Sequence, residues 1–185
     1  MHKAITLIIL AFLALVFGHA SATDDGIYIK QAELTQNEQS TLFNARIDYY
    51  LNDDIVEALD SGITLTFNVS LVIFERRPWL WNKRQATLIF PFRLKYNTLS
   101  QTYQVTNVTN NRKQVFSGLT PALHALGTIA DVSIYNIPTE LTSNHSATLD
   151  VSLNIEALPL PMRPLAYIKP NWHVRSDTFQ WLLNQ

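Results

Sequence analysis

Apolar and polar residues alternate along most of this chain, and a period of two residues is typical of a strand that buries one face. The alternation is clear in residues 43–51, 63–73, 88–96 and 147–155, and a shorter run begins at Tyr103. Residues 26–36 predict a further strand with mixed residues on both faces. Side chains expected to face the core include Phe43, Ile47, Phe67, Leu71, Leu94 and Leu149.

A short helix is predicted directly after the strand at 43–51. Asn52 can cap its first turn, the acidic residues that follow suit the positive end of its dipole, and Gly62 lies just beyond its end. Ile55 and Leu59 are four residues apart and can share one buried face. So short a helix must be stabilised by packing on the sheet rather than by its own propensity.

A second short helix is predicted to start with Thr120 as its cap and Pro121 at its first helical position, and to end at Gly127. Several strands joined by short helical connections indicate a mainly β domain with antiparallel strands. We expect a β-sandwich-like domain with two short helices. The alternative is a single curved antiparallel sheet with both helices on one face, an α+β arrangement.

Residues 156–174 hold four of the eight prolines of the chain. Proline cannot donate to a strand ladder, so strand pairing should weaken after Glu156. Leucines at 158 and 160 alternate with prolines, which predicts an extended, proline-stiffened strap that crosses the core and buries Leu158, Leu160 and Trp172. The strap should also deliver Phe179 and Trp181 to the core. A free polyproline docking peptide is the less favoured alternative, because strand-like sequence flanks this segment.

The N-terminus has the features of a secretory signal peptide. An apolar run from Ala4 to Phe17 is too short to span a bilayer as a helix, and Ala20-Ser21-Ala22 provides a small-x-small cleavage site, with Ala20 and Ala22 as the recognised residues. Residues 1–22 are therefore predicted to be removed. The remainder, 23–185, has the length of one domain and contains no second apolar run that would predict a transmembrane segment.

The composition disfavours several kinds of chemistry. The chain has no cysteine, which excludes thiolate catalysis and cysteine-bound zinc, and its five glycines form no phosphate-binding loop. Its formal net charge of −1 disfavours nucleic acid as a partner. His124, His145 and His173 lie far apart and have no metal-ligand spacing. We therefore expect no cofactor, no metal site and no enzymatic activity.

One segment, ERRPWLWNKR at residues 75–84, combines cations with aromatic rings. Four cations and one glutamate give it a local charge of +3, and it lies between two strands, at a hairpin tip. The candidate partner-binding residues are Arg76, Arg77, Trp79, Trp81, Lys83 and Arg84. Such a set suits an anionic partner: lipid headgroups, a glycan with carboxylates, or an acidic protein surface. The sequence favours a second interpretation over this one, in which both tryptophans fold back onto Trp172 or Tyr167 beneath stacked arginines.

Four stretches of the chain together resemble a known family. They are NARIDYYLNDDIVEALDSGITLTF, ERRPWLWNKR, FRLKYNTLSQTYQV and LPLPMRPLAYIKPNWHVRSDTFQW. Their order and spacing resemble the proteobacterial exported family called domain of unknown function 4390. The resemblance implies a bacterial cell-envelope protein, with no activity and no functional residues attached.

These observations together predict an exported protein of the Gram-negative periplasm, soluble or peripherally associated with a membrane. The most favoured function is a non-enzymatic binding or adaptor domain for an envelope protein, an anionic lipid surface or a glycan. The alternative is a carrier of a lipid or another small hydrophobic ligand, because long apolar strands can enclose a cavity.

Overall fold

The computed structural model describes residues 25–36, 40–135, 137 and 141–183. The predicted signal peptide at 1–22, with its cleavage residues Ala20 and Ala22, lies outside the described residues. No helix in the described part of the chain is long and apolar enough to cross a membrane.

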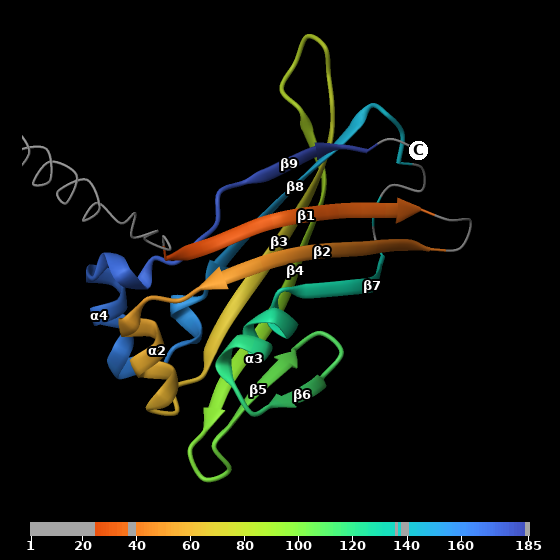
Figure 1. Cartoon of the computed structure of the whole chain (residues 1–185). Coiled ribbons are helices and arrows are strands. Elements are labelled where there is room, and N and C mark those ends of the chain that lie inside the picture. Colours follow the sequence, from red (N-terminus) through yellow and green to blue (C-terminus); the bar gives the residue numbers. More distant parts are fainter. Residues whose placement is uncertain (1–24, 37–39, 136, 138–140, 184–185) are drawn as a thin grey trace, which may run out of the picture.

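Two antiparallel sheets form the domain. The smaller has the strand order β1-β2-β7, and the larger has the order β6-β5-β4-β3-β8-β9. Figure 1 shows the smaller sheet lying across the larger one, with the two sets of strands crossing steeply. The sandwich-like arrangement is thus confirmed over the single curved sheet. The strands are β1 (Gly26–Gln36), β2 (Thr41–Tyr50), β3 (Leu65–Glu75), β4 (Lys83–Asn97), β5 (Thr102–Asn107), β6 (Arg112–Phe116), β7 (Thr128–Ile134), β8 (His145–Leu153) and β9 (Phe179–Leu182).

The core lies between the sheets and uses the predicted apolar faces. Phe43, Phe67 and Leu149 are all 0% exposed. Aromatic pairs connect the two sheets: the rings of Phe43 and Phe90 stack with centroids 5.4 Å apart, and those of Tyr49 and Phe67 meet edge to face at 5.1 Å. The period-two pattern therefore identified the buried face of these strands correctly.

The first predicted helix is α2 (Asp53–Asp60), and its cap is confirmed. The side-chain oxygen of Asn52 accepts a hydrogen bond from the Ile55 amide at 3.1 Å. Ile55 and Leu59 are fully buried. This helix connects the smaller sheet to the larger one, because it follows β2 and precedes β3.

The second helix, α3 (Leu119–Leu126), starts earlier than predicted. Gly118 occupies the cap position without a side-chain hydrogen bond, so the assignment of Thr120 as the cap was wrong. Pro121 lies within the first turn, where backbone amides have no intrahelical partner and proline is tolerated. The predicted end at Gly127 is confirmed.

The proline-rich segment is a folded strap, but it is not extended. It forms three turns of 3-10 helix, η1 (Ile155–Ala157), η2 (Leu160–Met162) and η3 (Pro170–Trp172), and a third helix, α4 (Arg163–Ile168). Proline occupies a first or second position in η2, α4 and η3. Its fixed φ suits the start of a helical turn, so the prolines turn the chain instead of stiffening it.

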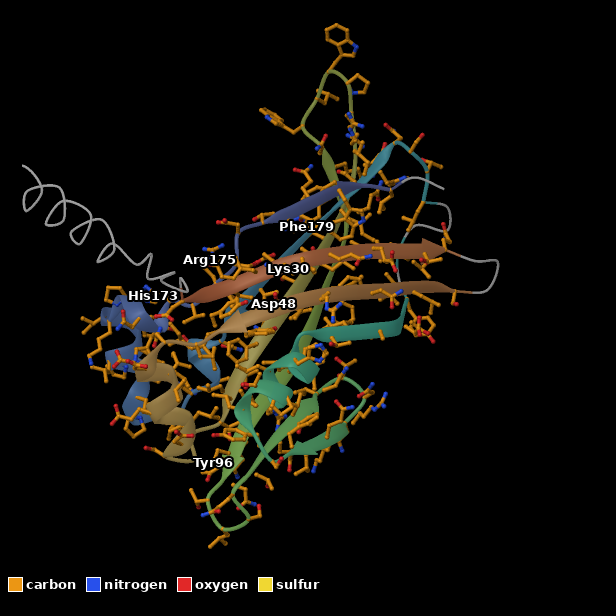
Figure 2. All side chains as sticks on the ribbon, in the orientation of Figure 1. Lys30, Asp48, Tyr96, His173, Arg175 and Phe179 are labelled. Carbon is orange, nitrogen blue, oxygen red and sulfur yellow. The ribbon has the colours of Figure 1, made fainter. Side chains whose placement is uncertain are left out.

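Burial along the strap follows this path. Leu158 and Trp172 are 1% and 3% exposed, as predicted, whereas Leu160 is 73% exposed, so its predicted burial was wrong. From α4 the chain passes His173 and Arg175 near the start of β1 and reaches Phe179 on β9 (Figure 2). Phe179 and Trp181 pack against the core while remaining partly exposed.

Tyr49 offers a test of the core. Its hydroxyl is buried and has no hydrogen-bond partner among the described residues. Because an unpaired buried hydroxyl costs about 1–3 kcal/mol, Tyr49→Phe is expected to raise the free energy of unfolding by about 1 kcal/mol. Urea titrations of both proteins near neutral pH would measure the difference, and a destabilised variant would contradict the expectation.

The same variant should change the response to alkali. Burial raises the pKa of the Tyr49 phenol above its usual range. As pH rises, the unfolded chain therefore loses this proton at a lower pH than the folded domain does. The free energy of unfolding is unaffected below about pH 10 and falls above it, by up to about 1.4 kcal/mol per pH unit. Tyr49→Phe should remove this part of the loss. Subtracting its stability curve from that of the parent removes the contributions of other tyrosines.

Candidate functional site

The candidate partner-binding residues lie at the free end of the β3–β4 hairpin. The two strands pair as far as Glu75 opposite Lys83, and residues 76–82 connect them. Figure 1 shows this loop extending well beyond both sheets, and Figure 2 shows its side chains standing clear of the rest of the molecule. The predicted position at a hairpin tip is confirmed. We call residues 75–84 the hairpin tip.

A β-bulge lies immediately before the hairpin tip. Ile73 pairs with Ala86 and Phe74 with Arg84, so Gln85 is an extra residue on β4. The side-chain amide of Gln85 donates to the Glu75 carboxylate at 2.5 Å, and this hydrogen bond stabilises the bulge. A bulge increases the local twist and redirects the strands beyond it. The bulge therefore contributes to the direction in which the hairpin tip leaves the sheet.

Contacts at the base of the hairpin tip fix its root. The Arg76 amide donates to the carbonyl of Asn144 at 2.8 Å, and β8 begins at the next residue, His145, which pairs with Glu75. The Leu80 amide bonds the Arg77 carbonyl at 3.4 Å within the loop itself. The base of the hairpin tip is thus held by hydrogen bonds to β8 and the residue before it, whereas the backbone hydrogen bond near the apex lies within the loop.

The apex is apolar and exposed. Trp79 is 94% exposed, Leu80 67% and Trp81 93%. Neither tryptophan packs on Trp172, which is buried in the strap, or on Tyr167, whose hydroxyl donates to the carboxylate of Glu156. The packing alternative is therefore not the arrangement found, and these side chains contribute little to the core.

The cations flank the apex on both strands. A guanidinium nitrogen of Arg77 lies 3.7 Å from the Glu75 carboxylate, and both side chains are partly exposed. An ion pair in contact with water contributes at most about 1 kcal/mol. Arg76, Lys83 and Arg84 are exposed, and within the described part of the chain they have no ion pair. The hairpin tip thus offers unpaired positive charge beside exposed aromatic rings.

A second polar cluster was not predicted from the sequence. A guanidinium nitrogen of Arg46 lies 3.2 Å from Nε2 of His124, although the two residues are 78 positions apart. Because guanidinium only donates, this ring nitrogen is the acceptor of the contact. Beside it, Asp131 has a φ of 51° and donates its amide to Asn44 at 2.7 Å. The outward position of Arg46 on its strand was the only signal in the sequence.

This cluster lines a surface pocket of about 490 Å³. The pocket includes Glu33 and Asp131 as well as Arg46 and His124, so its charges are mixed. Among the described residues, no serine, threonine or carboxylate of the pocket forms a hydrogen bond with the ring of His124. A nucleophile activated by a base would require such a bond. In the described ranges, no group of three or more histidine, cysteine, aspartate or glutamate side chains could hold a metal ion.

Comparisons with known proteins gave one match. The search of curated proteins and the search of solved structures found no match. The sequence profile of one family matches residues 24–182, which include every described strand and helix and the whole hairpin tip. The chain therefore belongs to the family described as "Domain of unknown function (DUF4390)".

Proposed function

We propose that this chain is an exported, non-enzymatic binding domain that attaches to an anionic component of the bacterial cell envelope through its hairpin tip. One observation carries the proposal: Trp79 and Trp81 are more than nine-tenths exposed beside unpaired cations. Core packing does not explain side chains in this position, and exposed apolar groups rimmed by charge typically mark an interaction site.

Export is supported by the N-terminal sequence. The apolar run Ala4–Phe17 followed by alanines at 20 and 22 has the features of a cleaved signal, and it would deliver the domain to the periplasm of a Gram-negative bacterium. There the domain would be soluble or attached to a membrane surface.

A binding role has more support than catalysis or ligand transport. The Arg46–His124 pair provides no nucleophile, and the centre of the space between the sheets is filled by side chains such as Phe43 and Phe67. A pocket of about 380 Å³ lies at one edge, between the larger sheet, α3 and β7, and polar side chains such as Arg112 line it together with apolar ones. A carrier of a lipid or other hydrophobic ligand would need a mainly apolar cavity. Native mass spectrometry of the purified domain distinguishes these roles, because a carrier would retain a ligand and an adaptor would not.

Charge at the hairpin tip is expected to control binding. Changing Arg76, Arg77, Lys83 and Arg84 to serine should alter the free energy of unfolding by less than about 1 kcal/mol per residue, because exposed charges contribute little to folding. Sedimentation with an envelope fraction, containing membranes and periplasmic proteins, should fall strongly. Rising salt should weaken binding of the parent in the same way, since salt screens exposed charges.

A matched control removes the same charge elsewhere. Arg93, Lys95, Arg112 and Lys113 are exposed on β4 and β6, at the end of the larger sheet away from the hairpin tip. Their replacement by serine should leave envelope binding close to that of the parent. Equal losses in both quadruple variants would show that net charge, rather than the hairpin tip, governs binding and would contradict the proposal.

A further inference from the structure

We infer that the hairpin tip inserts into the surface of an anionic lipid bilayer, with Trp79, Leu80 and Trp81 at the boundary between headgroups and acyl chains. The inference rests on the proposed function and names its partner. Among the three anionic partners considered, a bilayer fits the arrangement of side chains best, for reasons of depth, charge and area.

The depth of the apex matches that of an interfacial anchor. Lys83 pairs with Glu75 and Arg84 with Phe74, and the loop at 76–82 continues beyond these pairs. Trp79, in the middle of the loop, is four residues from both Glu75 and Lys83, so at about 3.3 Å per residue of extended chain it lies at most about 13 Å beyond that pair. Interfacial anchors bury their apolar groups by about 5–10 Å. Cations at the phosphate level would therefore place the apex at the headgroup boundary.

The residue types also suit this depth. Tryptophan is enriched at the membrane–water interface, where its ring is apolar and its N–H remains hydrogen-bonded. Arg76, Lys83 and Arg84 have no protein anion to compete with lipid phosphates among the described residues. Basic side chains beside an anionic leaflet strengthen attachment, an effect that falls off within the Debye length.

The small area of the apex favours a bilayer over a protein. A stable protein interface buries about 800 Å² on each partner, contributed by about 20–30 residues. Within the hairpin tip the apolar surface is confined to Pro78–Trp81, and five of the six other residues are charged. A fluid bilayer accepts an isolated apolar wedge without a complementary surface around it.

Vesicle binding tests the inference directly. The probe is a vesicle of phosphatidylcholine and phosphatidylglycerol in equal parts, compared with phosphatidylcholine alone. The parent should sediment with the anionic vesicles, and its tryptophan emission should shift to the blue and be quenched by brominated acyl chains. Trp79→Ala combined with Trp81→Ala should lower vesicle affinity by at least about 100-fold, since each ring buries on the order of 150–250 Å².

The control variant changes exposed apolar residues elsewhere. Leu165 and Ile168 on α4 are 47% and 80% exposed, and α4 lies at a different end of the molecule from the hairpin tip (Figure 1). Leu165→Ser combined with Ile168→Ser should bind vesicles like the parent. Thermal unfolding of each variant confirms that any loss of binding occurs in a folded domain.

The outcomes separate the inference from the proposed function. Failure of the folded parent to bind anionic vesicles, while tip-dependent binding to the envelope fraction persists, overturns the bilayer and indicates a protein or glycan partner. If the folded parent binds neither anionic vesicles nor the envelope fraction, both the bilayer inference and the proposed function are overturned. Vesicle binding that the α4 variant abolishes and the tryptophan variant retains also overturns the inference, because α4 would then be the anchor.

Discussion

Replacing Gly127 with alanine is expected to lower the free energy of unfolding by roughly 2–6 kcal/mol, the sum of a steric clash and an unsatisfied amide. A Cβ atom at Gly127 would lie 1.8 Å from the carbonyl oxygen of Ile47 and 2.9 Å from its carbon. The Ile47 amide also donates to the Gly127 carbonyl at 2.9 Å, so the contact cannot open without losing this bond. Ile47 belongs to the central strand of the smaller sheet, where its backbone has little room to move.

The φ of Gly127 is −87°, which any residue can adopt. Glycine is therefore required by the close approach of two backbones and not by conformational freedom. Thermal unfolding should show a transition about 4–20 °C lower in the variant. Gly118→Ala, at the other end of α3, is the control. Its Cβ would meet Pro121 at 3.5 Å, an ordinary contact, and it should cost about 1 kcal/mol or less. Similar losses in both variants would contradict the close approach.

Local patterns were sufficient to predict most elements. The strand predicted at 26–36 has those bounds, and the apolar faces of β2, β3 and β8 are the buried ones. Asn52 caps its helix as its side chain and position indicated. These features depend on residues a few positions apart, which is the range over which hydrophobic periodicity and capping act.

Features that depend on distant residues could not be predicted in the same way. Nothing in the sequence of β7 indicated that it pairs with β2, about 85 positions earlier, or that Arg46 would meet His124. The prediction of an extended strap was wrong for a different reason. Prolines suit both an extended chain and the first turn of a helix, and the choice between them depends on packing against α2 and the sheets.

The hairpin tip shows the same division. Its place between β3 and β4 followed from the two strands on either side. The exposure of Trp79 and Trp81 did not, because a tryptophan beside arginines suits a packed lid as well as a binding surface. The deciding fact is that the loop at 76–82 extends beyond both sheets (Figure 1), because β3 and β4 continue to pair as far as Glu75 and Lys83.

Deleting residues 157–185 is expected to unfold the domain. The strap buries Leu158 and Trp172, and truncation of such residues costs roughly 2–5 kcal/mol each, against about 5–15 kcal/mol for a whole domain. The Ser176 hydroxyl accepts from the backbone amide of Val151 at 3.0 Å, and the Ser176 backbone amide donates to the Val151 carbonyl at 2.8 Å. Ser176 also forms an isolated β-bridge with Ile27 of β1. The deletion thus removes a connection between the two sheets, together with the edge strand β9.

The strap also holds the first helix. The side-chain amide of Asn52 donates to the backbone carbonyl of Asn171 at 2.7 Å. The side-chain amide of Asn171 donates to the Asp54 carboxylate at 3.1 Å. Circular dichroism of the truncated chain should show no cooperative thermal transition. A transition that remains near the parental temperature would mean that the strap is a peripheral peptide.

A matched pair of point variants tests the strap in the full-length chain. Leu158→Ala should lower the free energy of unfolding by roughly 2–5 kcal/mol, because Leu158 is 1% exposed and its removal leaves a cavity. Leu160→Ala, two residues later, should change it by less than about 0.5 kcal/mol, because that side chain is 73% exposed. An extended strap would bury both leucines and give two similar losses. Unequal losses in denaturant titrations would therefore show that the chain turns at Pro159, which lies between the two leucines and caps η2.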